Sequence, residues 1–380
     1  MTEIHGTCDE RFAPVRAAFE RNFEKGLDVG ASAAVTIDGE FVVDIWAGHT
    51  DEDRTQPWER DTIINVWSTT KTMTALCALV LADRGELDFH SPVARYWPEF
   101  AAAGKAGVQV RHLMSHSAGL SGWNQPVTEA DIYDWEKSTS MLAAQEPWWE
   151  PGTASGYHAI TQGHLVGEVV RRITGQTLGQ FFAAEIAGPL GADFHIGLPA
   201  EHDHRTARVF PPPALPIDLL PTDSIPFKTF TGPPLRAEAS WEDAWRRAEI
   251  PAANGQGNAR SVAAVQSLVA CGGSLGGVTL LSPQGCDRIF EVQSVGTDLV
   301  LGVPVRYGMG YGIIGEEMPL GPSTKACFWG GWGGSIVIVD LENRMCVTYV
   351  MNRMGEGTLG DERGAGIVVG AYEAIAGVSR

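Results

Sequence analysis

The sequence predicts an α+β protein in which one antiparallel sheet, flanked by helices, is built from both ends of the chain, with a helical segment inserted between its halves. Three observations lead to this prediction. Both ends combine strand patterns with a helix pattern. The middle is dominated by helical patterns. The chain has 380 residues, 44% of them hydrophobic, which is enough to bury a large core.

The N-terminal part predicts a helix followed by a hairpin. Apolar residues recur at spacings of three and four within residues 9–25 and stop at Gly26, which is typical of an amphipathic helix. Residues 33–37 and 41–46 are rich in strand formers and are joined around Asp38-Gly39, a strong signal for a two-residue hairpin turn.

The C-terminal part predicts three further strands and a closing helix. The strand patterns cover residues 325–329, 335–340 and 345–351, and the last two are joined by a short turn. Residues 361–375 have a helical pattern. The two ends of the chain therefore resemble each other, which is why we expect them to share one sheet.

The middle of the chain carries helical periodicity from residue 68 to about residue 188. Residues 210–234 contain eight prolines and predict an irregular, partly extended loop or lid. We expect residues 1–75 and 250–380 to form an α/β domain, and residues 76–249 to form a mainly helical domain.

The charge of the chain restricts its partners. There are 28 basic and 46 acidic side chains, which gives a formal charge of −18. Phosphate binding needs clustered cations, so this balance argues against a nucleic-acid or membrane surface and disfavours anionic substrates. The N-terminus lacks a secretory signal, and no apolar run approaches the roughly 18 residues that span a bilayer. We expect a cytoplasmic protein whose six scattered cysteines stay reduced.

Two glycine-rich segments match known signatures without the partners that those signatures need. Residues 272–276 match the G-x-S-x-G nucleophile elbow, yet all ten histidines lie at or before His204, so none follows Ser274. Residues 355–360 match a dinucleotide fingerprint, but the chain ends at residue 380, before a second strand and its ribose-binding acid. We expect a turn and a connecting loop.

His112 and His116 have the i, i+4 spacing of metal ligands on a helix. No H-E-x-x-H motif and no nearby third ligand accompany them. We expect ordinary hydrogen-bonded histidines, no metal site and no cofactor.

The S-x-x-K sequence at residues 68–71 is the remaining candidate for chemistry. Residues three apart share one face of a helix, so the Lys71 amine can reach the Ser68 hydroxyl. At a first helical turn, the Ser68 amide is also an unpaired donor that can hold an oxyanion. The apolar residues 75–81 that follow predict a buried helix, which would lower the pKa of Lys71 and make it a base. The alternative is an N-cap serine with a surface lysine.

Four ordered motifs give the sequence a specific resemblance. They are S-T-T-K at 68–71, L-M-S-H-S-A-G-L at 113–120, P-G-T at 151–153 leading to Y-H-A at 157–159, and W-G-G-W-G-G-S at 329–335. Over almost its whole length the chain resembles the serine β-lactamase and penicillin-binding-protein superfamily, in particular the class C-related esterases called family VIII carboxylesterases. The resemblance implies a β-lactamase/transpeptidase-like fold with the active site in the groove between sheet and helical domain.

The resemblance also implies roles for individual residues. Ser68 would be the acylated nucleophile and Lys71 its partner. Tyr157 would take the serine proton as a phenolate, for which Lys71 is the available cation. The backbone amides of Ser68 and Trp332 would form the oxyanion hole. The alternative for Tyr157 is a buried tyrosine that tethers a loop.

Two departures from the family pattern bear on the substrate. Where β-lactamases have K-T-G, this chain has Trp329-Gly330-Gly331, and the Asn of their Y-x-N motif is Ala159. A lysine and an amide that contact β-lactams are therefore missing, which points to neutral esters. We expect Trp329, Gly330 and Gly331 to contact the substrate. Further candidates for the acyl-group wall are the proline-rich residues 210–234 and Trp123, Trp148 and Trp149, and these tryptophans can equally be ordinary core or interface aromatics.

Together these observations predict a serine carboxylesterase that hydrolyses short or medium acyl esters through an acyl-enzyme on Ser68. The expected partner is a small-molecule ester, and a homo-oligomer is possible. Two alternatives stay open: an amidase, peptidase or weak β-lactamase of the same superfamily, and a catalytically silent ligand-binding relative.

Overall fold

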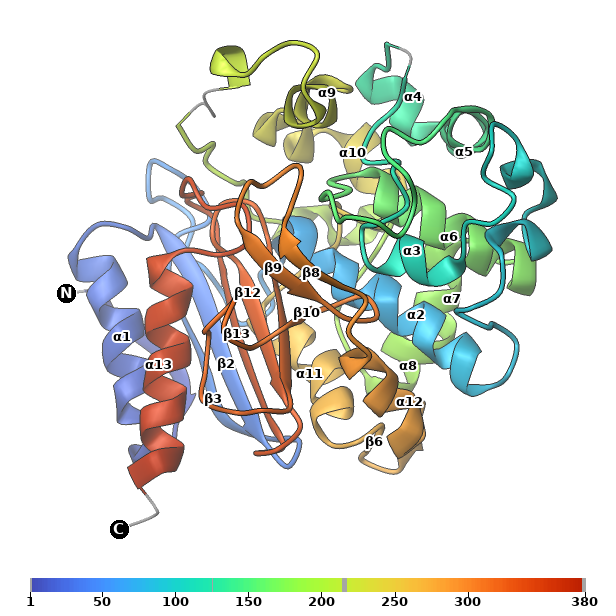
Figure 1. The fold of residues 1–380 in the computed structure, drawn as a ribbon. Coiled ribbons are helices and arrows are strands. Elements are labelled where there is room, and N and C mark those ends of the chain that lie inside the picture. Colours follow the sequence, from blue (N-terminus) through green and yellow to red (C-terminus); the bar gives the residue numbers. More distant parts are fainter. Residues whose placement is uncertain (1, 125, 214–216, 378–380) are drawn as a thin grey trace.

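The computed structural model describes residues 2–124, 126–213 and 217–377, and its centre is a nine-stranded sheet (Figure 1). The strand order is β1-β3-β2-β13-β12-β11-β10-β9-β8, and each strand is antiparallel to its neighbours. The strands are β1 (Ile4–Cys8), β2 (Gly30–Ile37), β3 (Glu40–Gly48), β8 (Ser294–Thr297), β9 (Pro304–Tyr307), β10 (Gly312–Ile313), β11 (Ala326–Gly330), β12 (Ile336–Asp340) and β13 (Met345–Met351). The pairing of β2 with β13 joins the two ends of the chain, which confirms the predicted sheet.

The expected hairpin is β2–β3. Asp38 and Gly39 form its turn with φ angles of 52° and 85°, the left-handed pair that this turn type requires. The strands that the sequence did not reveal are β1 and β8–β10. The latter three have four, four and two residues, so their own patterns are too short to be recognised.

Helices cover both faces of the sheet. On one face, α1 (Ala13–Glu24) and α13 (Glu362–Ala376) lie side by side, coloured blue and red in Figure 1. On the other face, α11 (Ala259–Ala270) packs against β2, β12 and β13. The Thr348 hydroxyl donates to the Ala259 carbonyl over 2.8 Å, which ties the start of α11 to the sheet.

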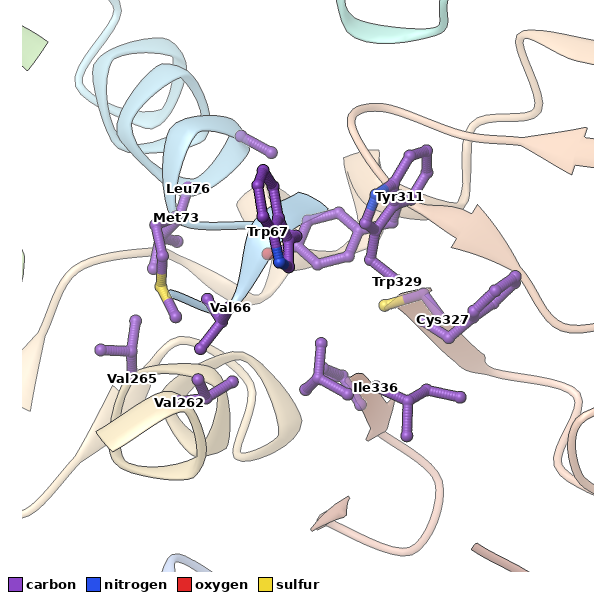
Figure 2. Packing of buried hydrophobic residues seen from close by; sticks show 14 of the residues in the cluster. Val66, Trp67, Met73, Leu76, Val262, Val265, Tyr311, Cys327, Trp329 and Ile336 are labelled. Carbon is purple, nitrogen blue, oxygen red and sulfur yellow. The ribbon is translucent and has the colours of Figure 1, made fainter. Parts of the chain in front are cut away.

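The helical part of the chain has α2 (Lys71–Asp83) at its centre. This helix is buried from Lys71 to Ala82, so it forms the core of that part. Figure 2 shows how apolar side chains of α2, α11 and the strands β11 and β12 meet in one core. The other helices are α3 (Val110–Met114), α4 (Glu129–Tyr133), α5 (Trp135–Ala144), α6 (Thr161–Thr174), α7 (Leu178–Phe182), α8 (Gly188–Leu190), α9 (Ile225–Thr231), α10 (Asp243–Arg247) and α12 (Pro283–Asp287).

Three further expectations concern the connections. The proline-rich segment is not wholly irregular, because it contains α9, whose first turn is capped by the Ser224 hydroxyl. Residues 214–216 of that segment lie outside the described residues. Gly272 and Gly273 form a turn that leads into the small hairpin of β6 (Ser274–Leu275) and β7 (Val278–Thr279), and Gly276 lies in the turn of that hairpin. Residues 355–360 connect β13 to α13, as predicted.

The predicted division into two domains stays a prediction. Its boundary at residue 75 falls within α2, which is continuous. Among the described residues, no helix combines the length and the hydropathy needed to cross a bilayer.

Candidate active site

The nucleophile candidate lies on a tight turn between a strand and a buried helix. The short strand β4 (Ile64–Asn65) pairs with β5 (Gln256–Gly257), and a 3₁₀ turn over Trp67–Thr70 then leads into α2. Trp67 has a φ of 50°, a left-handed conformation that is costly for an aromatic residue and that is often found at functional sites. The Thr70 hydroxyl holds this turn by donating to the Trp67 carbonyl over 2.6 Å. The turn places Ser68 on the same face as Lys71.

Ser68, Lys71 and Tyr157 form a closed triangle of hydrogen bonds. The Lys71 Nζ lies 3.1 Å from the Ser68 Oγ and 3.1 Å from the Tyr157 OH. The Tyr157 OH donates to the Ser68 Oγ over 2.5 Å. The structure therefore brings together all three residues that the sequence predicted as catalytic, although Tyr157 is 86 residues from Lys71.

Burial lowers the pKa of Lys71. Its side chain is 1% exposed, and this desolvation holds its pKa well below the usual value of a lysine. The Nζ also donates to the carbonyls of Ala159, over 2.7 Å, and Ala252, over 3.0 Å. A neutral amine has two N–H donors, and these two carbonyls accept both of them. The lone pair of the amine is then left for the Ser68 hydroxyl, 3.1 Å away, as a general base requires, because the Tyr157 proton is already directed at the Ser68 Oγ.

Burial of Tyr157 favours its phenol form over the phenolate that we expected. Burial raises its pKa, and the hydrogen bond with Ser68 offsets this only in part. The expected phenolate depends on Lys71 as a cation, and the burial of Lys71 favours its neutral amine, so the phenolate stays a prediction. Both pKa shifts favour the uncharged form of each residue.

Asp298 fixes the backbone of Tyr157 from the far edge of the sheet. Its buried Oδ1 accepts hydrogen bonds from the amides of Tyr157, over 3.0 Å, and of Val300 and Leu301, each over 2.9 Å. The Leu299 amide adds a bond to the Ser155 carbonyl over 2.8 Å. Sequence reasoning missed this residue, because an aspartate that binds backbone amides leaves no motif.

Two neutral histidines support the same segment. His158 donates from Nδ1 to the Gly156 carbonyl over 2.6 Å and accepts at Nε2 from the Leu120 amide over 3.1 Å, which defines its tautomer. Burial lowers the pKa of His158 to about 3. His116 accepts at Nδ1 from the His158 amide over 3.1 Å, and its ring stacks on Trp329. Residues 113–120 therefore act as a support for Tyr157.

The strand end after Trp329 approaches the nucleophile turn closely. A Cβ on Gly331 would lie 2.3 Å from the Ser335 Oγ, 2.4 Å from the Val66 carbonyl and 3.3 Å from the Ser68 amide nitrogen, so only glycine fits. The amides of Ser68 and of Trp332, the next residue, donate to no described backbone carbonyl. Both are available to an oxyanion, and the oxyanion hole itself stays a prediction.

A cavity of about 360 Å³ opens onto this group. Ser68 and Tyr157 line it, and its wall is mostly apolar. The proline-rich segment supplies part of this wall, as expected. The other lining residues are Trp67, Ala159, Ile160, Pro211, Pro212, Pro213, Ile217, Phe230, Leu235, Arg236, Ala237, Glu238, Ala253, Trp332 and Thr358.

The structure does not bring Trp329, Trp123, Trp148 or Trp149 to the cavity. Trp329 is 1% exposed and packs against the rings of neighbouring aromatic residues, so it supports Tyr157 from behind. Trp123, Trp148 and Trp149 are held by hydrogen bonds of their indole N–H groups to Ser138, Asn124 and Ala154. These residues support the loops around the site. Trp67 and Trp332 line the cavity instead.

Gly330, the other glycine predicted to contact substrate, also packs against backbone. A Cβ there would lie 2.2 Å from the Leu359 carbonyl oxygen. Gly330 and Gly331 therefore allow close packing of the strand end, and neither lines the cavity.

The histidines with metal-ligand spacing have structural partners. His112 accepts at Nδ1 from the Gln109 amide over 3.2 Å, at the start of α3, and burial lowers its pKa to about 4. Within the described residues, no three His, Cys, Asp or Glu side chains gather as metal ligands.

Comparison with known proteins agrees with this geometry. The beta-lactamase family model matches residues 19–371. The chain is 36% identical over 365 residues to the esterase/beta-lactamase LipL of Mycobacterium tuberculosis, covering 92% of this chain and 83% of LipL. A crystal structure of a family VIII carboxylesterase superposes with a TM-score of 0.92 at 45% identity, covering 98% of this chain and 100% of that one. A penicillin-binding protein homologue from Caulobacter crescentus gives a TM-score of 0.89 at 37% identity, with coverage of 98% and 100%.

These similarities extend over nearly the whole chain and therefore include the sheet, the helical part and the site between them. They confirm the predicted β-lactamase/transpeptidase-like fold. With its Ser68, Lys71 and Tyr157 triangle and a family match from residue 19 to residue 371, the chain belongs to the beta-lactamase family.

Proposed function

We propose that this protein is a serine carboxylesterase that hydrolyses short or medium acyl esters through an acyl-enzyme on Ser68. The observation that carries the proposal is the triangle of Ser68, Lys71 and Tyr157 at one end of a mostly apolar cavity. The names of two similar proteins, the esterase/beta-lactamase LipL and the family VIII carboxylesterase, support it.

The protonation states account for acylation. Ser68 Oγ attacks the ester carbonyl while its proton passes to the neutral Lys71 amine. The carbonyl oxygen becomes an oxyanion that the amides of Ser68 and Trp332 stabilise. When the intermediate collapses, the leaving alkoxide takes the Tyr157 proton, and Tyr157 takes the proton held by Lys71. The alcohol leaves, and Lys71 is again a neutral amine.

Deacylation uses the same groups. Water attacks the acyl-enzyme and gives its proton to Lys71, and the same amides hold the second oxyanion. Collapse releases the carboxylic acid as Ser68 regains its proton from Lys71. No step needs a cofactor.

The third motif supports a neutral substrate. Trp329 stands where the family's lysine would attract a carboxylate, and its ring is buried away from the cavity. The one arginine among the described cavity residues, Arg236, is already paired with Glu129 and Glu242. We therefore favour ester hydrolysis over turnover of anionic β-lactams.

The nucleophile is tested by replacing Ser68 with alanine. We expect Ser68→Ala to abolish hydrolysis of p-nitrophenyl butyrate and labelling by a fluorophosphonate, measured by mass spectrometry of the intact protein. Ser274→Ala is the matched control, because Ser274 lies on an exposed hairpin in the motif that resembles a nucleophile elbow. Undiminished turnover by Ser68→Ala, or loss of labelling in Ser274→Ala, would disprove the assignment.

The setting of the activity is also part of the proposal. It includes a cytoplasmic location, a small-molecule partner, no nucleic-acid partner and assembly into a homo-oligomer, and the formal charge of −18 supports the exclusion of nucleic acid. Cell fractionation and size-exclusion chromatography with light scattering would test these statements.

A further inference from the structure

The cavity wall carries a negative charge that nothing in the esterase reaction uses. Arg236 and Glu238 both line the cavity. Arg236 donates to the two carboxylate oxygens of Glu129, over 3.1 and 2.9 Å, and to Glu242 over 3.2 Å. This one cation is shared between two carboxylates, and no described Lys, Arg or His pairs with Glu238. Glu129 and Glu242 lie outside the cavity lining, and with Arg236 and Glu238 they bring the sum of the four charges to −2 next to a mostly apolar surface.

Aromatic rings line the same cavity. Trp67, Tyr157, Phe230 and Trp332 all contribute to its wall. The rings of Trp67 and Trp332 meet edge to face, with their centroids 5.0 Å apart. The face of an aromatic ring attracts a cation, and the attraction is stronger where water is excluded. Rings and an unpaired carboxylate in one cavity therefore favour a positively charged group and disfavour an anion.

The apolar wall restricts the kind of cation. A primary ammonium ion has three N–H donors, and it loses hydrogen bonds to water when it enters an apolar cavity. A quaternary ammonium group has no N–H donors, so it loses none, and its methyl groups suit an apolar wall. The formal charge of −18 on the chain further attracts cations toward the molecule.

We propose that the cavity selects esters that carry a quaternary ammonium group, with Glu238 as the residue that determines this specificity. The proposal rests on the proposed esterase function and names the substrate class of that site. Ser68, Lys71 and Tyr157 perform the chemistry as before. Glu238 and the aromatic wall hold the cation in the same cavity.

A pair of isosteric esters tests the proposal. Butyrylcholine and 3,3-dimethylbutyl butyrate have the same shape and the same acyl group, and differ by the charge on one atom. We expect kcat/KM, measured by pH-stat titration at fixed ionic strength, to favour the choline ester by about tenfold. Glu238→Gln should reduce this ratio to about one. Glu316→Gln, which removes an exposed carboxylate outside the cavity, should retain the wild-type ratio.

A binding measurement separates this proposal from the esterase proposal. Choline should bind the wild-type protein more tightly than 3,3-dimethylbutan-1-ol in isothermal titration calorimetry, and Glu238→Gln should remove the difference. Equal binding of the two alcohols, a kinetic ratio of one or less, or an unchanged ratio in Glu238→Gln would overturn the cationic preference. If choline is preferred but neither ester is hydrolysed, the esterase proposal fails and the cation site stands.

Discussion

The burial of Lys71 favours the neutral amine that catalysis needs, and it lowers the free energy of unfolding. Burial holds the pKa of Lys71 well below its usual value and so favours the neutral amine in the folded protein, whereas an unfolded chain protonates a lysine below pH of about 10.4. Because the unfolded state binds one more proton below that pH, folding loses free energy as the pH falls. The destabilisation is present at pH 7 and is relieved as the pH rises to about 10.

This argument predicts the behaviour of Lys71→Met. The variant should lose esterase activity by a factor of about 1,000 or more. Its free energy of unfolding relative to wild type should increase as the pH is lowered from 10 to 7, by up to about 1.4 kcal/mol per pH unit. Urea unfolding of both proteins at several pH values measures the difference. A difference that does not change with pH would show that Lys71 is a cation in the folded protein.

The same residues show what sequence patterns can reveal about a site. Ser68, Lys71 and Tyr157 belong to short motifs whose spacing reflects the chemistry, so they were predicted. Asp298 binds backbone amides, which have the same chemical identity at every position, so no pattern marks it. The cavity wall includes Trp67 and Trp332, not Trp123 and Trp148, because the direction of a tryptophan ring is decided by tertiary packing.

At the level of elements, the loop between β8 and β9 controls the position of Tyr157 through Asp298. Asp298→Ala removes the acceptor of three amides, one of them from Tyr157. We expect kcat for p-nitrophenyl butyrate to fall by about 10- to 100-fold with little change in KM, because misplacement of a proton donor affects the transition state.

Asp298→Asn is the matched control, since its amide oxygen can still accept these bonds. It should recover most of the lost kcat. If both variants have wild-type kcat and only a lower melting temperature, Asp298 stabilises the fold without positioning Tyr157.

The sequence predicted the elements whose turn and strand residues lie within one stretch of the chain. It did not predict the short strands that are defined only by their pairing with other strands. The β2–β3 hairpin has its turn residues and strand residues within one stretch of sequence, so its bounds were close to correct. Strands β8 to β10 are defined by pairing with one another and with β11, and the two residues of β10 carry no pattern of their own. Short strands of this kind become visible only when the whole sheet is assembled.

For the whole molecule, the closure of the fold depends on α1 and α13, which bring the two ends of the chain together. A Cβ on Gly370 would lie 2.9 Å from the backbone of Pro14 and Val15, so this glycine lets the two helices approach closely. Gly366, one turn earlier in α13, has room, since its Cβ would lie 3.8 Å from that of Ala18. The two glycines therefore give opposite predictions for the same substitution.

Gly370→Ala should destabilise the protein by about 1–3 kcal/mol, because the helices must separate to admit the methyl group. Gly366→Ala should stabilise it by up to about 1 kcal/mol through helix propensity.

Because β2 and β13 join the chain ends within the sheet that supports Trp332, activity and secondary structure should be lost at the same temperature in both variants. Circular dichroism and residual esterase activity during heating measure this. If part of the helical signal is lost at a lower temperature than activity, the site does not depend on the packing of α1 against α13.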